Sequence, residues 1–207
     1  MQDLEAELRG LFASHPPRLK VDADDVPRAA VAMILAPREP AAAESATDVL
    51  FIRRAEVDGD PWSGHMAFPG GRQSVGDADL IETARRETRE ETGIDFARTS
   101  VTGRLDDYHP SSPGLPPIVI APFVVWLPEQ APIEPNHEIA GHVWVPLEVL
   151  SDPVHRSDFT LHRSERSRTF VTIEYEGHTI WGLTFNIVSQ FLDVLTIAGL
   201  PDGQDST

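Results

Sequence analysis

Apolar residues recur every three or four positions in three segments of this chain, which is the spacing of an amphipathic helix. The three segments are residues 2–14, about 80–92 and 185–195. Asp79, followed three residues later by Glu82, is typical of a helix start, and Gly93 is typical of a helix end. The sequence therefore predicts the middle helix together with both of its boundaries.

Runs of β-branched and other apolar residues lie between and after these segments, and turns rich in Pro and Gly bound them. Strands are expected at residues 29–35, 48–54, 101–106, 118–127, 142–145, 169–175 and 178–182. The strands outnumber the helices. The order of the elements predicts an α/β fold in which a mixed sheet lies between helices, an α/β/α sandwich.

The chain is long enough for one sizeable hydrophobic core and too short for two, with 207 residues of which 41% are hydrophobic. We therefore expect one domain at residues 28–200. A helix and linker at residues 1–27 would precede it, and a disordered tail at residues 201–207 would follow it. The segment 37–47, which contains Pro, Ala and Glu, is expected to be a mobile connector between two strands.

The composition is strongly acidic, with 17 Lys and Arg against 33 Asp and Glu and a formal net charge of −16. A surface of this sign repels a phosphate backbone, so a nucleic-acid polymer is not expected as a partner. The absence of cysteine excludes disulfides, zinc–thiolate sites and thiol nucleophiles. No apolar run approaches the roughly 20 residues of a membrane span, and the first residues lack a basic start. We therefore expect a cytoplasmic protein with no membrane partner.

Three glutamates of the middle helix carry the chemistry that stands out most. Glu87, Glu90 and Glu91 occupy positions i, i+3 and i+4, which share one helical face. Like charges this close repel unless a cation lies between them, and oxygen-only ligands suit Mg²⁺ or Mn²⁺. We therefore predict a divalent-metal site. The alternative is a solvated helix with ion pairs such as Arg86 with Glu90, but it leaves the glycine-rich segment ahead of the helix unexplained.

These residues resemble the Nudix box of hydrolases that act on a nucleoside diphosphate linked to another group. The resemblance rests on Phe68-Pro69-Gly70-Gly71-Arg72, Arg86-Glu87 and Glu90-Glu91-Thr92-Gly93-Ile94. It implies a loop–helix–loop in which Glu87, Glu90 and Glu91 bind the metal and Arg86 orients them. The turn of Gly70 and Gly71 would let the backbone approach the substrate. The sequence departs from the family pattern at Asp77, which stands in the place of a box glutamate, with one residue more than usual before Arg86.

A narrower resemblance, to the coenzyme A pyrophosphatase branch of the family, flanks the box. It rests on the segments 49–55, 64–71 and 180–184. That branch cleaves the diphosphate of coenzyme A to phosphopantetheine and adenosine 3′,5′-bisphosphate. Its upstream signature has a second arginine where this chain carries Asp60, Pro61, Trp62 and Ser63, and a missing cation weakens the case for a substrate with an extra phosphate.

Residues outside the box complete the predicted site. Glu138 is a candidate additional metal ligand or general base, with a plain surface residue as the alternative. Arg54, Arg72 and the glycine turn are candidates for substrate phosphate binding, and a structural salt bridge is the alternative for either arginine. Trp62 could stack on a base. The eight histidines show no metal-ligand spacing.

Three hypotheses of function follow. The first is a Nudix-type pyrophosphohydrolase that uses Mg²⁺ or Mn²⁺ and acts on coenzyme A or an acyl-CoA, with Glu90, Glu91, Arg86 and Glu138 as catalytic residues. The second is a pyrophosphatase for ADP-ribose or a nucleotide sugar, and the third a non-catalytic nucleotide-binding regulatory module on the same fold. The resemblance also implies a homodimer.

Overall fold

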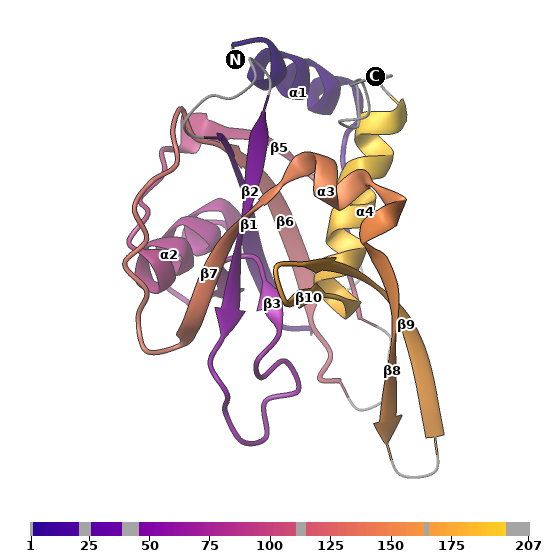
Figure 1. Ribbon diagram of the computed structural model, residues 1–207. Coiled ribbons are helices and arrows are strands. Elements are labelled where there is room, and N and C mark those ends of the chain that lie inside the picture. Colours follow the sequence, from indigo (N-terminus) through magenta and orange to yellow (C-terminus); the bar gives the residue numbers. More distant parts are fainter. Residues whose placement is uncertain (1, 21–25, 39–45, 111–114, 164–165, 198–207) are drawn as a thin grey trace.

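The computed structural model describes residues 2–20, 26–38, 46–110, 115–163 and 166–197. A mixed sheet lies between two helices, α2 (Leu80–Thr92) on one face and α4 (Gly182–Ile197) on the other (Figure 1). The predicted α/β fold with a mixed sheet between helices is confirmed. The predicted tail at 201–207 and most of the predicted connector at 37–47 lie outside the described residues.

The main sheet has seven strands within the described part of the chain. Their central order is β3-β2-β1-β6-β5, while β4 pairs with β1 and β7 pairs with β2. The one parallel ladder of this sheet joins β1 to β6, from Arg28 opposite Val119 to Leu35 opposite Trp126. The strands are β1 (Arg28–Pro37), β2 (Thr47–Arg54), β3 (Met66–Ala67), β4 (Gly70–Arg72), β5 (Val101–Arg104), β6 (Val119–Trp126) and β7 (Ile139–Pro146).

Alternation along β1 divides the hydrophobic core into two halves. Met33 and Leu35 contribute to the core on the α4 side, and Ala32, Ile34 and Ala36 contribute to the core on the α2 side. All five residues have no exposed surface. Since both faces of the central strand are buried, its sequence is a continuous apolar run, which is how it was predicted.

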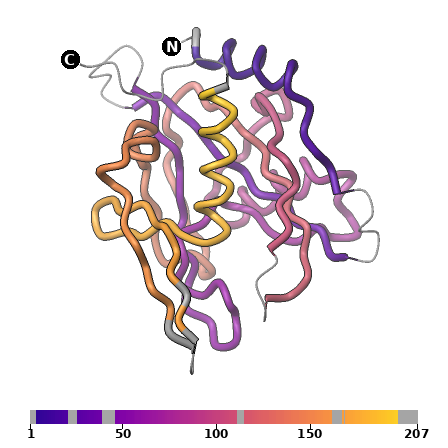
Figure 2. The backbone as a smooth tube through the Cα atoms, turned by 90° about the vertical axis from the view of Figure 1, so that its right-hand side faces the viewer, coloured from indigo at the N-terminus to yellow at the C-terminus, as the bar shows by residue number. Residues whose placement is uncertain are grey.

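The N-terminal helix α1 (Gln2–Ser14) lies across one end of the sheet and shares the core on the α4 side (Figure 2). Leu8 and Leu11 are buried there, and Phe12 lies so close to Gly103 of β5 that a Cβ on this glycine would be 2.0 Å from its ring. Arg9 donates a 3.0 Å hydrogen bond to the Val101 carbonyl. The predicted helix is thus present and is fixed to strand β5.

A second sheet beyond β7 was only partly predicted. It consists of β8 (Arg156–Arg163), β9 (Arg166–Tyr175) and β10 (His178–Ile180), in the order β10-β9-β8. The sequence indicated β9 and β10 but not β8, whose polar and charged residues give no apolar run. The short helix α3 (Leu147–Ser151) and the 3₁₀ turns Arg98–Ser100 and Pro153–His155 were also not predicted.

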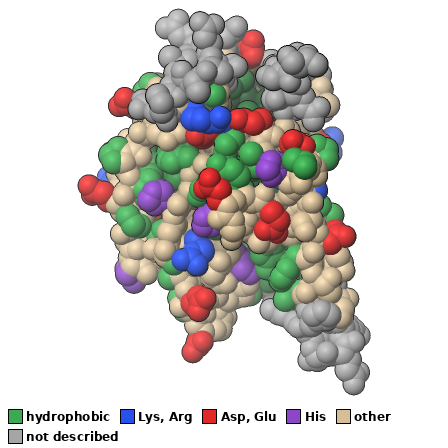
Figure 3. Space-filling view, in the orientation of Figure 1, with side chains coloured by type: hydrophobic (Ala, Val, Ile, Leu, Met, Phe, Trp, Pro, Cys, Tyr) green, Lys and Arg blue, Asp and Glu red, His purple; other side chains and the backbone are tan. Residues whose placement is uncertain are grey.

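Three predicted strands are shorter in the structure, and one of them, β6, loses only a residue at each end of the predicted 118–127. Strand β5 ends at Arg104 and not at residue 106, and β10 ends at Ile180 because Gly182 adopts a positive φ of 61° where α4 begins. In the described residues, no helix is long and apolar enough to cross a membrane. Acidic side chains are scattered over the face seen in Figure 3, where Lys and Arg are fewer.

Candidate active site

The loop–helix–loop is built from local capping interactions. The Asp79 carboxylate accepts a 3.0 Å hydrogen bond from the Glu82 N–H at the start of α2. At the other end Gly93 has a left-handed φ of 77°, and its N–H donates to the Arg89 carbonyl. Asp79 and Gly93 fix where α2 begins and ends. They thereby determine where the glutamates of α2 lie relative to the sheet.

The glycine turn places backbone against the glutamates of α2. Gly70 has a φ of 150°, and a Cβ there would lie 2.2 Å from the Ala30 carbonyl oxygen. A Cβ on Gly71 would lie 2.5 Å from the carboxyl carbon of Glu87. Since only glycine leaves this space, Gly71 lets the backbone lie against the Glu87 carboxylate, and Gly70 lets it lie against Ala30 and Val31 of β1.

Glu91 is the most deeply buried of the three glutamates, with 3% of its surface exposed. Burial raises the pKa of its carboxyl to about 7, although the N–H of Gly70, at 2.8 Å, and the charge of Arg54 both favour the ionised form. Burial also raises the pKa of Glu87. Glu90 is more open, with 51% of its side chain exposed. Carboxyl groups whose pKa is raised by burial beside a pocket, as in Glu91 and Glu87, are typical of a functional site.

Arg86 joins the helix to the loop that precedes it. Its Nε and Nη2 atoms donate to the two carboxylate oxygens of Asp77 at 2.9 and 3.0 Å. Its Nη1 atom lies 2.8 Å from a Glu87 oxygen and 3.2 Å from a Glu90 oxygen. The hydrogen bonds from Arg86 hold the pKa of Asp77 far below its usual range. Arg86 therefore fixes the two glutamates by being itself fixed to Asp77.

Asp77 and Asp79, the two acidic residues nearest to the missing box glutamate, have structural contacts in this chain. The Asp77 side chain is 6% exposed and binds Arg86, while Asp79 caps α2 and pairs with Arg98 at 2.7 Å. Neither residue lines the pocket described below. The extra residue before Arg86 is thus accommodated by a loop whose acidic side chains anchor α2.

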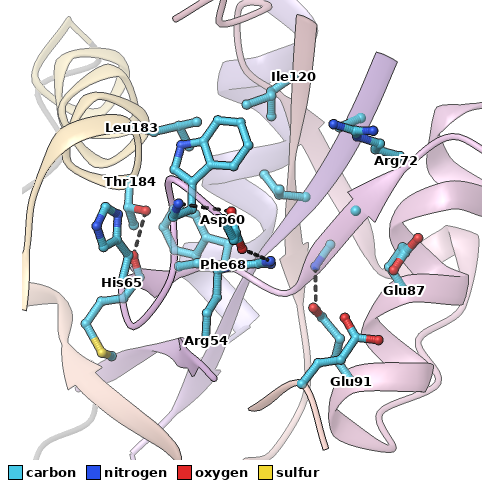
Figure 4. Close-up of a pocket in the computed structure, with 18 of the residues that line it drawn as sticks. Arg54, Asp60, His65, Phe68, Arg72, Glu87, Glu91, Ile120, Leu183 and Thr184 are labelled. Carbon is cyan, nitrogen blue, oxygen red and sulfur yellow. Dashed lines mark hydrogen bonds and ion pairs between the residues drawn. The ribbon is translucent and has the colours of Figure 1, made fainter. Parts of the chain in front are cut away.

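A pocket of about 560 Å³ opens beside the glutamates (Figure 4). Glu87 and Glu91 of α2 face the strand that carries Arg72, and Arg54 and Asp60 lie between these glutamates and Leu183 in that view. All the predicted site residues except Arg86 line the pocket. They are Arg54, Gly70, Gly71, Arg72, Glu87, Glu90, Glu91 and Glu138.

Glu138 reaches the pocket from the loop before β7. Its N–H donates to the Asn136 side chain at 2.8 Å, and its carbonyl accepts from the Ala55 N–H at 2.7 Å. The backbone of Glu138 is therefore anchored although its side chain is exposed. Arg54 faces the pocket while Arg53, the next residue, is exposed on the other side and donates to the Ala140 carbonyl. This is the alternation expected of neighbours on a strand.

The far half of the pocket is apolar and was not predicted as part of the site. His65 packs against Trp181 with tilted rings whose centroids are 4.5 Å apart, and Phe159 of β8 also packs against Trp181 at 5.0 Å. The Thr184 hydroxyl donates to the Met66 carbonyl at 2.8 Å and ties α4 to β3. Both His65 and Trp181 lie in segments that carry the narrower resemblance, but the sequence did not indicate their contact, because it depends on the second sheet.

The donor set fits a hard divalent cation, since every side chain at this end of the pocket that could bind a metal is a carboxylate. In the structure these carboxylates are directed to protein partners: Glu91 to Gly70, and Glu87 and Glu90 to Arg86. Over the residues described, no three side chains stand close enough together to form a ready metal site. A metal would therefore draw Glu87 and Glu90 partly away from Arg86.

The comparisons with known proteins agree with this geometry. A family model described as the NUDIX domain matches residues 26–164. An uncharacterized protein of Schizosaccharomyces pombe is 39% identical over 110 residues, which is 51% of this chain and 33% of that protein. The uncharacterized Nudix hydrolase NudL of Yersinia pestis is 34% identical over 137 residues, which is 65% of this chain and 66% of NudL.

Solved structures show the same fold. A MutT/nudix family protein of Enterococcus faecalis has a TM-score of 0.57 at 18% identity, covering 83% of this chain and 62% of that one. The Nudix hydrolase RenU of M. smegmatis has a TM-score of 0.50 at 16% identity, covering 84% and 86%. The domain match extends over more than half of the sequence, so this chain belongs to the Nudix family. The predicted assignment to a family of hydrolases is thereby confirmed.

Proposed function

We propose that the chain is a metal-dependent pyrophosphohydrolase that cleaves the diphosphate linkage of a nucleoside diphosphate derivative. The observation that carries this proposal is the glycine turn that lies against the buried Glu91 and the half-buried Glu87. Ionisation of the Glu91 carboxyl at neutral pH costs free energy, yet this carboxyl is held 2.8 Å from the Gly70 N–H in the wall of a pocket. A cation bound there would remove that cost.

Each residue has a distinct task in this proposal. Glu87, Glu90 and Glu91 hold Mg²⁺ or Mn²⁺, which when bound neutralises diphosphate charge and activates water. Arg86, fixed by Asp77, keeps Glu87 and Glu90 on the pocket side of α2. Glu138 accepts the proton of the attacking water, because it reaches the same pocket from the opposite loop.

The remaining polar groups bind the substrate. Arg54 and Arg72 line the pocket on the sheet side. A diphosphate bound between them and the glutamates would lie next to both arginines. The missing side chain of Gly71, beside the Glu87 carboxylate, would let a phosphate approach the backbone of the glycine turn. The charge of the substrate would thus be shared between metal, arginine and backbone.

Two substrate classes fit the pocket. Coenzyme A or an acyl-CoA, giving phosphopantetheine and adenosine 3′,5′-bisphosphate, is the first candidate, because of the sequence segments that flank the box and because an apolar wall suits the pantetheine arm. ADP-ribose or a nucleotide sugar is the second. This second class is favoured by the ion pair of Arg54 with Asp60 at 2.9 Å. Because Arg54 is paired, fewer cationic side chains of the pocket are available for the extra phosphate of coenzyme A. The homodimer and the cytoplasmic location stay predictions.

The test is a panel of substrates with product identification. The protein is incubated with Mg²⁺ or Mn²⁺ and with coenzyme A, acetyl-CoA, ADP-ribose, NADH or ATP, and the products are identified by mass spectrometry. We expect metal-dependent cleavage of a diphosphate bond in at least one derivative. Tight binding of one compound without cleavage of any would contradict the proposal and favour the non-catalytic module.

A further inference from the structure

Asp60 is an unexpected residue in a pocket for a polyanion. It lines the pocket together with four glutamates, Glu87, Glu90, Glu91 and Glu138, but it comes from the loop after β2 and not from the predicted metal cluster. Its side chain is 20% exposed. The carboxylate is therefore a fixed negative charge inside the cavity that the substrate would enter.

The loop holds this carboxylate in one position. Oδ1 accepts the Trp62 N–H at 3.0 Å, and Oδ2 accepts Nη2 of Arg54 at 2.9 Å. The Asp60 carbonyl accepts the Ser63 N–H, and the Ser63 hydroxyl accepts the Val57 N–H. Burial alone would raise the pKa of Asp60, but the Trp62 N–H and Arg54 outweigh burial and the pKa is lowered. Asp60 thus stays charged at neutral pH.

Arg54 relates Asp60 to the glutamates. Its charge favours the ionised form of Glu91 on one side, and its guanidinium binds Asp60 on the other. In Figure 4 the Arg54 guanidinium lies between Asp60 and Glu91. Asp60 also borders an adjoining open groove that includes Arg72 and Trp62. A substrate group that extends from the diphosphate past Arg54 would meet the Asp60 carboxylate.

We propose that this group is the ribose of the substrate and that Asp60 selects the substrate there, accepting hydrogen bonds from free hydroxyls and repelling a further phosphate. Two like charges about 5 Å apart in a partly buried site interact strongly enough to change affinity at least about tenfold. A carboxylate that accepts two hydroxyl hydrogen bonds is a favourable partner for a diol. The substrate class is then a nucleoside diphosphate derivative with an unphosphorylated ribose. This inference rests on the proposed function and narrows it.

The experiment compares two substrates that differ by one phosphate, dephospho-coenzyme A and coenzyme A. For the wild-type protein, kcat/KM for dephospho-coenzyme A should exceed that for coenzyme A by about tenfold or more. Asp60→Asn should reduce this ratio to within about threefold, mainly through a lower KM for coenzyme A. The matched control is Asp58→Asn, which removes the same charge from an exposed position of the same loop and should keep the wild-type ratio.

Equal rates on both substrates, a wild-type preference for coenzyme A, or an unchanged ratio in Asp60→Asn would overturn the inference. If Asp60→Asn does not fold, as judged by thermal unfolding, the wild-type ratio decides alone. If no member of the substrate panel is cleaved, the proposed function fails, and the inference is then tested by calorimetry without turnover. Tighter wild-type binding of AMP than of adenosine 3′,5′-bisphosphate would support it, and the reverse order would overturn it.

Discussion

At the scale of single residues, the site combines groups that are unfavourable for folding. Glu91 is buried with a carboxyl pKa near 7, since burial penalises its charge. A residue of this kind costs stability whenever it is ionised. We infer that Glu91 is retained as a metal ligand although its charge lowers the stability of the fold, as is common for residues of functional sites.

The variant Glu91→Gln tests this trade directly. The pKa of the Glu91 carboxyl is about 7 in the folded protein and 4.5 in the unfolded chain. The contribution of this carboxyl to the stability of the wild type is therefore fully present below pH 4.5 and is lost as the pH rises through 7. Without metal at pH 8, the free energy of unfolding of Glu91→Gln should therefore be about 1–3 kcal/mol higher than that of the wild type. Urea unfolding at pH 5 and pH 8 measures this. A variant less stable than the wild type at pH 8 would refute the account.

Replacing the glutamates assigned as metal ligands should also abolish most of the turnover. Glu90→Gln and Glu91→Gln should each lower kcat by orders of magnitude, because each removes a charged metal ligand, while the far-ultraviolet circular dichroism stays unchanged. Glu129→Gln is the control, since Glu129 is exposed and does not line the pocket. Rates near the wild-type value in either ligand variant would show that the assignment is wrong.

At the scale of elements, the sequence predicted the parts whose signals are local. The Asp79 cap, the Gly93 end and the continuous apolar run of β1 all lie within a few residues of what they determine, and each was placed correctly. Strand β8 and the contact of His65 with Trp181 were missed. Strand β8 lacks an apolar run, although its partner β9 follows it directly, and the contact of His65 with Trp181 joins segments far apart in the chain, so no local pattern indicates either.

The glycine turn offers a paired test at this scale. In Gly71→Ala the new Cβ meets only the end of the Glu87 side chain, which can move, so activity should fall at least about tenfold with little loss of stability. In Gly70→Ala the Cβ meets the backbone of Ala30 and Val31 at a positive φ, so the protein should lose about 2 kcal/mol or more. Thermal unfolding and kcat, measured on both variants, separate the two. Equal stability losses would contradict the distinction.

At the scale of the whole molecule, the net charge of −16 sets how ions act on the protein. Like charges spread over one surface repel, and salt screens them with a length of about 10 Å at 0.1 M. A divalent ion can therefore stabilise this protein in two ways, through general screening and through binding at the glutamates. The two contributions must be separated at constant ionic strength.

Raising NaCl from about 10 to 300 mM should raise the melting temperature of the wild type and of Glu91→Gln by similar amounts, because screening does not depend on one buried residue. Replacing part of the NaCl by MgCl₂ at constant ionic strength should raise it further only in the wild type. Differential scanning calorimetry on both proteins measures these shifts. A magnesium shift of the same size in both would mean that the glutamates do not bind the ion.

The most direct measurement of the central claim is a titration with Mn²⁺ followed by electron paramagnetic resonance, which reports free Mn²⁺, at constant ionic strength. The account predicts saturable binding to the wild type and to Glu129→Gln, with binding weakened by at least about tenfold in Glu91→Gln. Equal Mn²⁺ binding by the wild type and Glu91→Gln would contradict it.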